Sequence, residues 1–218
     1  MFWRNNSLSI VLAALFLFSL TGQVWSGWLE YNSETVMHGD SAIPLAAYLR
    51  SGHFWEATGE NWESEFLQMA AFVWLTCFLR QKGSAESKRI DVIEDVDLDP
   101  RRFADYPESP WPVRRGGWIL KLYENSLGIT FVLLFVISIA IHAVGGLANV
   151  NESLEAHGQP PMLAIDYLRS SQFWFESFQN WQSEFLSLFA MVAGTIYLRQ
   201  RGSAESKPLH AANSETGR

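Results

Sequence analysis

Apolar residues gather into four blocks along the chain, and polar residues fill the segments between them. The first block runs from Leu8 to Trp28 and the third from Leu127 to Leu147. At ~1.5 Å per residue, about 21 residues reach the ~30 Å of a bilayer core. Each of these two blocks therefore predicts a membrane-spanning helix.

The second and fourth blocks, Phe66–Leu79 and Phe185–Leu198, are shorter. They cross the bilayer core only if their helices extend back to Trp62 and Trp181. Tryptophan suits the headgroup level, where the indole N–H stays in water and the ring in hydrocarbon. Because backbone polar groups at membrane depth must be hydrogen-bonded within the segment, the four blocks predict two helical hairpins.

The chain repeats itself at a distance of 119 residues. Of the 83 positions from Asn6 to Lys88, 35 carry the same residue 119 positions later, without a gap. The longest matches are Tyr48–Ser51 with Tyr167–Ser170, Ser64–Leu67 with Ser183–Leu186, and Gly83–Lys88 with Gly202–Lys207. The pattern predicts two tandem copies of one two-helix unit.

A cleaved signal peptide is the alternative interpretation of the first block, because Arg4 precedes an apolar run near the N-terminus. The repeat argues against it, since the equivalent block lies in the middle of the chain.

The repeat also predicts the domain organisation. Residues 1–88 form the first membrane repeat and residues 118–207 the second. Residues 89–117 form a cytoplasmic linker rich in Asp and Pro, with too few apolar residues for a core. Residues 208–218 are expected to be a disordered cytoplasmic tail.

Basic residues predict the orientation. Apart from Arg50 and Arg169, every Lys and Arg lies in the N-terminus, the linker or the C-terminus. Because cytoplasmic flanks carry the excess of basic residues, we expect a multi-pass protein with both termini in the cytoplasm, which in a bacterium means the inner membrane. Both copies then point the same way, related by a pseudo-two-fold axis along the membrane normal.

The outer loops, Glu30–Glu60 and Asn149–Gln179, are long enough to contain structure. Each predicts a short amphipathic helix, at Leu45–Arg50 and at Met162–Arg169, followed by an aromatic pair that includes Trp55 or Trp174. Such an element either lies on the outer leaflet or forms a cap outside the membrane.

Polar residues form a stripe on each second span: Asn61, Ser64, Glu65, Gln68 and Thr76 in the first copy, and Asn180, Ser183, Glu184, Ser187 and Thr195 in the second. At 100° per residue they share about a third of the helix circumference. The candidate membrane site comprises Asn61, Glu65, Asn180 and Glu184, together with the outer cations Arg50 and Arg169. Carboxylates at the membrane boundary are costly to bury without a partner. Arg–Glu pairs that fix the hairpins, a proton, cation or solute site, and simple solvation remain as alternatives.

Other chemistry finds little support in the sequence. His38 and His157 match across the copies and invite a shared metal, but no further ligand spacing accompanies them and a residue before a turn glycine explains both. Cys77 is the single cysteine, which excludes disulfides and cysteine clusters. The net charge of −7 argues against a nucleic-acid partner. Known catalytic motifs are absent, so we expect neither an enzyme nor a cofactor or metal.

The turn Gly83–Lys88 and its copy Gly202–Lys207 are rich in small residues, as an anion cradle is. A helix end with glycine as its stop and lysine nearby explains them better.

With its repeated Tyr-Leu-Arg-Ser, Asn-Trp-x-Ser-Glu-Phe-Leu and Arg-Gln-x-Gly-Ser-Ala-Glu-Ser-Lys motifs, the chain resembles a family of bacterial integral membrane proteins catalogued as a domain of unknown function. The resemblance implies a bacterial membrane protein and supplies no substrate, cofactor or catalytic residue.

The sequence thus predicts an all-α membrane protein with four spanning helices and an amphipathic helix in each outer loop. We expect a non-enzymatic function in which the outer segments contact lipid, an envelope protein or a second copy of the chain. The alternative is a small proton, ion or solute transporter or channel component that uses Glu65 and Glu184.

Overall fold

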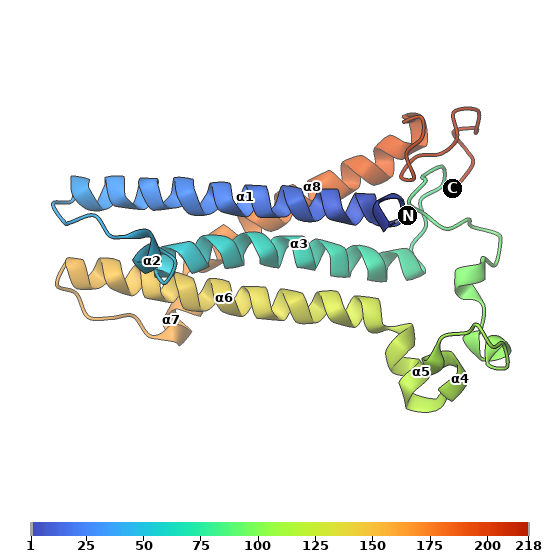
Figure 1. Ribbon diagram of the computed structural model, residues 1–218, viewed down its shortest axis with the longest axis horizontal. Coiled ribbons are helices and arrows are strands. Elements are labelled where there is room, and N and C mark those ends of the chain that lie inside the picture. The colour runs from blue at the N-terminus through green and yellow to red at the C-terminus, as the bar shows by residue number, and fades with distance from the viewer. Residues whose placement is uncertain (1, 218) are drawn as a thin grey trace. The chain divides into compact units, whose positions relative to one another are not determined.

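The computed structural model describes residues 2–217, and these are all-helical, without a strand. Figure 1 shows the helices in chain order. They are α1 (Phe2–Met37), α2 (Leu45–Tyr48), α3 (Gly52–Phe78), η1 (Asp95–Asp97), η2 (Pro100–Phe103), α4 (Trp111–Arg115), α5 (Gly117–Glu124), α6 (Ser126–Ala156), α7 (Ala164–Leu168) and α8 (Ser171–Tyr197).

The four long helices α1, α3, α6 and α8 coincide with the four apolar blocks, which confirms the all-α prediction. Two of them, α1 and α6, are long and apolar enough to cross a membrane. The other two are 27 residues each, but acidic residues such as Glu56, Glu63 and Glu184 lower their hydropathy. The prediction that all four helices span the bilayer therefore remains a prediction.

The chain forms two compact units that differ from the segments predicted by the repeat. Unit 1 contains the residues up to Gly59 together with Ala140–Phe173. Unit 2 contains Glu60–Ile139 together with the residues from Trp174 onward. Because α3, α6 and α8 each contribute to both units, neither unit coincides with one copy of the repeat.

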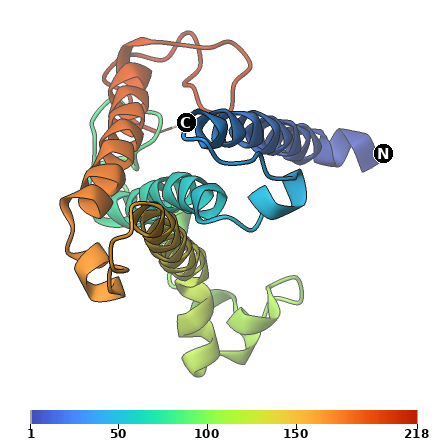
Figure 2. The same ribbon diagram turned by 90° about the vertical axis from the view of Figure 1, so that its left-hand side faces the viewer.

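In unit 1, the loops after α1 and α6 turn back beside the helices that they follow, as Figure 1 shows from the side and Figure 2 from the end of the helices. Asn32 of α1 makes two hydrogen bonds with the backbone of Ile43, at 2.7 and 3.0 Å. Asn151 of α6 makes the same pair with the backbone of Met162, at 2.7 and 3.3 Å. The two asparagines lie 119 residues apart, so matched residues fix matched loops.

Short helices α2 and α7 follow these loops, close to their predicted positions. Each is followed by a serine, Ser51 or Ser170, whose Oγ accepts a hydrogen bond from the backbone N–H three residues later. This is the arrangement of a helix N-cap, and it fixes where α3 and α8 begin. The tyrosines of the short helices, Tyr48 and Tyr167, are almost fully buried.

In unit 2, the linker and the tail are more structured than we expected. Val113 of α4 is buried, and so is Leu120 of α5 just after the linker, so the end of the linker takes part in a small apolar core. The tail, predicted to be disordered, forms several hydrogen bonds with the rest of unit 2. Disorder was predicted because the tail has a polar composition. The hydrogen bonds are accepted mostly by backbone carbonyls, which every sequence has, so the composition could not indicate them.

Candidate functional site

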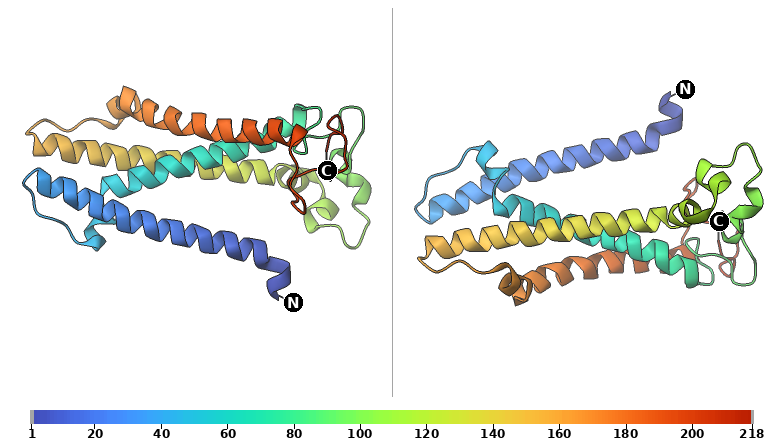
Figure 3. Two further views of the ribbon diagram at one scale, coloured as in Figure 1. Left: turned by 90° about the horizontal axis from the view of Figure 1, so that it is seen from above. Right: turned by 90° about the horizontal axis from the view of Figure 1, so that it is seen from below.

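A buried carboxylate lies at the centre of unit 1. Gly52, Glu56 and Gly59 have the spacing i, i+4, i+7, which places them on one face of α3. On α6, the residues His142, Gly145 and Asn149 have the spacing i, i+3, i+7 and also share one face. These two faces pack against each other, and Figure 3 shows α3 and α6 crossing.

Glycines let the two backbones approach closely. A Cβ atom on Gly59 would lie 2.4 Å from the backbone nitrogen of His142. A Cβ on Gly145 would lie 2.4 Å from the backbone nitrogen of Glu56, and one on Gly52 would lie 2.4 Å from that of Asn149. Since ordinary Cβ contacts begin near 3.4 Å, all three positions require glycine.

The Glu56 carboxylate is enclosed in this crossing and is only 8% exposed. Asn149 donates a hydrogen bond to Glu56 Oε2 at 2.7 Å, and the Tyr167 hydroxyl donates to Oε1 at 3.4 Å. A buried carboxylate is costly unless its oxygens are hydrogen-bonded, and here α6 and α7 supply the donors. Glu56 therefore links the first half of the chain to the second.

A second side-chain hydrogen bond in unit 1 joins α1 to α6. The Tyr31 hydroxyl of α1 donates to Glu152 Oε1 of α6 at 2.6 Å. The Tyr31 ring also packs against Tyr48 and His53, with ring centroids 5.7 and 5.5 Å away. Burial, with a smaller contribution from the charge of Glu30, raises the pKa of Tyr48.

The two matched histidines close the ends of their helices. His38 Nδ1 lies 2.8 Å from the carbonyl oxygen of Glu34, and His157 Nδ1 lies 2.7 Å from that of Ser153. Each histidine precedes a glycine with positive φ, Gly39 or Gly158. Within residues 2–217, no three His, Cys, Asp or Glu side chains form a group able to hold a metal ion.

In unit 2, α3 and α8 meet through polar side chains of the predicted stripes. Gln68 donates to the carbonyl oxygen of Glu184 at 2.8 Å and to Ser187 Oγ at 3.0 Å. Gln68 and Ser187 are 119 residues apart, so equivalent positions contact each other. Further along, Asn180 donates to the carboxylate of Glu60.

The predicted interfacial tryptophans have different surroundings. Trp55 and Trp174 are each 40% exposed, as an interfacial residue should be. The indole of Trp55 donates to the carbonyl of Leu49 at 3.1 Å. Trp62 and Trp181 are half-buried, and the Trp181 N–H, which we expected to be in water, donates to Glu63 at 3.1 Å. Glu63 is completely buried and therefore needs this donor.

The remaining predicted residues belong to both units. Arg50, Arg169, Asn61 and Glu65 are exposed, and none of the ion pairs among the described residues involves either arginine. Arg50 belongs to unit 1 and Glu65 to unit 2. Their pairing, and that of Arg169 with Glu184, stays a prediction.

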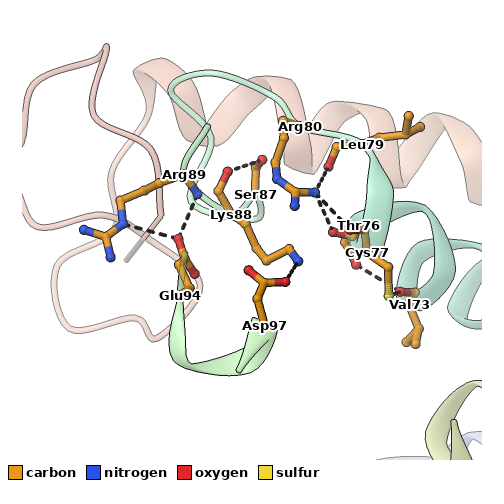
Figure 4. Close-up of polar contacts among 10 residues, drawn as sticks. All are labelled: Val73, Thr76, Cys77, Leu79, Arg80, Ser87, Lys88, Arg89, Glu94 and Asp97. Carbon is orange, nitrogen blue, oxygen red and sulfur yellow. Dashed lines mark hydrogen bonds and ion pairs between the residues drawn. The ribbon is translucent and has the colours of Figure 1, made fainter. Parts of the chain in front are cut away.

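Matched arginines close the C-terminal ends of α3 and α8. Arg80 Nη1 donates to the carbonyls of Thr76, Cys77 and Leu79, as Figure 4 shows for α3. Arg199 Nη1 donates in the same way to the carbonyls of Thr195, Ile196 and Leu198. A cation at this end of a helix also compensates the partial negative charge of its dipole.

The glycines of the two following turns do not stop the helices directly. Gly83 and Gly202 lie several residues after the last helical residue, with φ of 88° and 83°. Each turn is instead closed by a serine: Ser87 Oγ accepts from the Gln81 N–H, and Ser206 Oγ from the Gln200 N–H.

Beyond the first turn, the ion pairs of the linker begin (Figure 4). Lys88 pairs with Asp97 and lowers its carboxyl pKa, and Arg89 pairs with Glu94 at 3.3 Å. The backbone N–H of Arg89 is the main cause that lowers the pKa of Glu94. These two ion pairs hold residues 94–97 of the linker close to the residues where the linker begins.

Sequence reasoning missed Glu56. The repeat drew attention to matched residues, whereas Glu56 is matched by Phe175. A signal was nevertheless present, because Gly145-Gly146 interrupts an apolar block and Gly52-x-x-x-Glu56-x-x-Gly59 puts an acid between two glycines on one helical face. Together these mark a close helix crossing with a polar centre.

The fold defines a class: an all-helical protein with two helices long and apolar enough to cross a bilayer, which favours a membrane protein. Within that class, the chain belongs to the family described as Domain of unknown function (DUF6766), whose model matches residues 1–218. This confirms the resemblance to a family of unknown function. Comparisons with curated proteins and with solved structures find no match.

Proposed function

We propose that this chain is an integral membrane protein with four spanning helices. The observation that carries the proposal is that many large apolar side chains are exposed while several polar side chains are buried, the opposite of a protein surrounded by water. Leu15, Phe16, Leu17 and Phe18 are all exposed, and four consecutive residues at 100° steps surround the helix. Among the residues least exposed are polar ones: Thr58, Glu63, Ser84, Ser138, His142 and Ser177. Apolar residues outside and polar residues inside suit hydrocarbon as the surrounding medium.

In this proposal, the chain is a tandem duplication of a helical hairpin. Repeated contacts support it: the Asn32 and Asn151 loop bonds, the paired arginine caps, and the contact between Gln68 and Ser187. The distribution of basic residues supports cytoplasmic termini, and the family resemblance supports the bacterial inner membrane as the location.

The function that the geometry supports best is non-enzymatic contact between the outer segments and lipid. Leu163, Ile165 and Leu168, in and before α7, are all exposed, and Arg169 follows them. Large apolar side chains beside a cation suit the boundary between headgroups and acyl chains. An envelope protein or a second copy of the chain is the other partner class for these segments.

Reporter fusions test the topology. A periplasm-active enzyme fused after Ser33 or Glu152 should be active in both cases, and one fused after Lys88 should be inactive. Inactive reporters at both outer positions, or recovery of the native protein without detergent, would refute the four-span arrangement.

Photo-crosslinking tests the lipid contact. A photoreactive residue at Ile165 should form adducts with phospholipid in reconstituted vesicles. The neighbouring Asp166, which is also exposed but lies 100° away on α7, is the matched control. Equal adduct yields at both positions would count against an oriented lipid contact, and protein adducts at Ile165 would favour an envelope partner.

A small transporter or channel component is the second candidate. Glu184 is half-buried on the face of α8 that contacts Gln68, and Glu65 lies near enough to act on it electrostatically. Two acidic groups at one helix interface suit a proton or cation. Replacing both with Gln should abolish ion-dependent flux in vesicles, whereas Glu34→Gln should not, and unchanged flux in the double variant would remove this candidate.

A further inference from the structure

The C-terminal tail, residues 208–217, is anchored by a buried lysine. Lys207 Nζ donates to the backbone carbonyls of Ala212 and Asn213, both at 3.2 Å, and of Glu215 at 2.8 Å. The residue is only 2% exposed. Three carbonyls use all three donors of the ammonium group, so the tail curls around Lys207.

The arginine that caps α8 holds the same segment. Arg199 Nη2 donates to the carbonyl of Ala211 and to Asn213 Oδ1, both at 3.2 Å. Since Nη1 of the same side chain caps α8, one guanidinium joins the tail to the end of that helix.

The last described residues reach the turn after α3, as the red segment in Figure 1 shows. The Gly83 N–H donates to Thr216 Oγ1 at 2.8 Å, and the Gly217 N–H donates to the carbonyl of Ser84 at 3.0 Å. The approach is close, because a Cβ on Gly83 would lie 2.4 Å from the carbonyl oxygen of Asn213. The tail thus touches the ends of both α3 and α8.

Polar contacts rather than apolar burial hold the tail. Its one large apolar residue, Leu209, is 61% exposed. Segments held by a few hydrogen bonds near the surface belong to the least stable parts of a protein and open before the whole unfolds. Lys88, the counterpart of Lys207, pairs with Asp97 of the linker instead, so each turn binds the segment that follows it.

We propose that the C-terminal tail is a releasable strap that ties the end of α3 to the end of α8. When docked, it lines one side of an open cavity of about 660 Å³ at the end of α3, with Gly217 among the lining residues beside Phe72 and Lys88. Its release removes one of the ties between these helix ends and widens this cavity; another tie stays in place, because Thr195 of α8 is hydrogen-bonded to Ser84 Oγ at 3.0 Å and to the Ala85 N–H at 3.3 Å. The strap goes beyond the proposed lipid contact and does not depend on it.

A matched pair of glycine variants tests the strap in the full-length protein. Gly83→Ala and Gly202→Ala introduce the same methyl group at nearly the same positive φ, but nothing lies within 4 Å of a Cβ at Gly202. Amide hydrogen exchange of the tail should be at least tenfold faster in Gly83→Ala than in Gly202→Ala. Equal exchange in the two variants would overturn the proposal.

A milder variant and a distance measurement complete the test. Thr216→Val keeps the side-chain shape and removes the acceptor of the Gly83 N–H, so tail exchange should rise roughly fivefold. Spin labels at Lys82→Cys and Arg201→Cys, in a Cys77→Ala background, report the separation of the two turns. Thr216→Val should broaden their distance distribution; an unchanged distribution would show that the tail does not tie the helix ends.

Discussion

Replacing Gly59 by alanine should open the helix crossing that encloses Glu56. The new Cβ would lie 2.4 Å from the backbone nitrogen of His142, whereas ordinary contacts begin at 3.4 Å. The helices must therefore separate by about 1 Å, because the nitrogen belongs to the backbone and the position of the Cβ is fixed by the backbone, so neither atom can rotate away. A shift of that size would lengthen the 2.7 Å hydrogen bond between Asn149 and Glu56 beyond bonding range.

The expected loss of stability follows from three contributions. Overpacking in a close contact costs about 1–3 kcal/mol, and losing a hydrogen bond to a charged group costs about 1.5–3 kcal/mol. Alanine regains about 1 kcal/mol because it favours the helix more than glycine does. We therefore expect Gly59→Ala to lower the free energy of unfolding by roughly 1.5–5 kcal/mol.

Gly22→Ala is the matched control, because Gly22 also lies inside a long helix but nothing is within 4 Å of its Cβ position. This variant should be neutral or gain up to about 1 kcal/mol. Denaturant-induced unfolding of both variants in the same detergent, followed by circular dichroism, measures the difference. If the two variants differ by less than about 0.5 kcal/mol, the close crossing of α3 and α6 is not supported.

Three further predictions concern single contacts. Asn32→Ala removes both side-chain hydrogen bonds to Ile43, so the free energy of unfolding should fall by about 1–3 kcal/mol, and proteolysis of the loop after α1 should accelerate. Tyr31→Phe removes only the hydroxyl that reaches Glu152, so a smaller loss of about 0.5–1.5 kcal/mol is expected in the same unfolding assay. Arg101 lowers the pKa of the Asp99 carboxyl from 3.8 to about 2. The ion pair therefore stabilises its turn fully above pH 3.8, and this contribution is lost as the pH falls through about 2. An NMR titration of the Asp99 carboxyl carbon measures the pKa, and a midpoint near 3.8 would contradict the pairing.

The helical elements could be predicted from the sequence because they depend on local composition. Apolar blocks of sufficient length gave α1 and α6, and prolines followed by apolar residues gave α2 and α7 to within a few residues. Matched polar residues also indicated true contacts, since the stripe residues Gln68 and Ser187 meet in unit 2. Helix positions and contacts between equivalent residues of the repeat could thus be predicted, because they depend on residue type and spacing.

The interior contacts of both units could not be predicted in this way. Glu56 and Glu63 are unmatched in the repeat, and each depends on a donor more than 90 residues away in the chain. The order of the tail depends on the carbonyls around Lys207, which any sequence of the same length would supply. Such contacts follow from the path of the backbone, which one sequence without its fold does not reveal.

The Glu56 centre makes the two halves of the chain chemically interdependent. The acid comes from the first half, and Asn149 and Tyr167 come from the second, while Phe175 takes the place of an acid at the matching position. Expressed alone, the N-terminal half would keep the Glu56 carboxylate but lack α6, which encloses it, and both of these donors. Neither half of the chain is therefore expected to fold alone as it does in the full-length protein, even though the sequences of the two halves align without a gap.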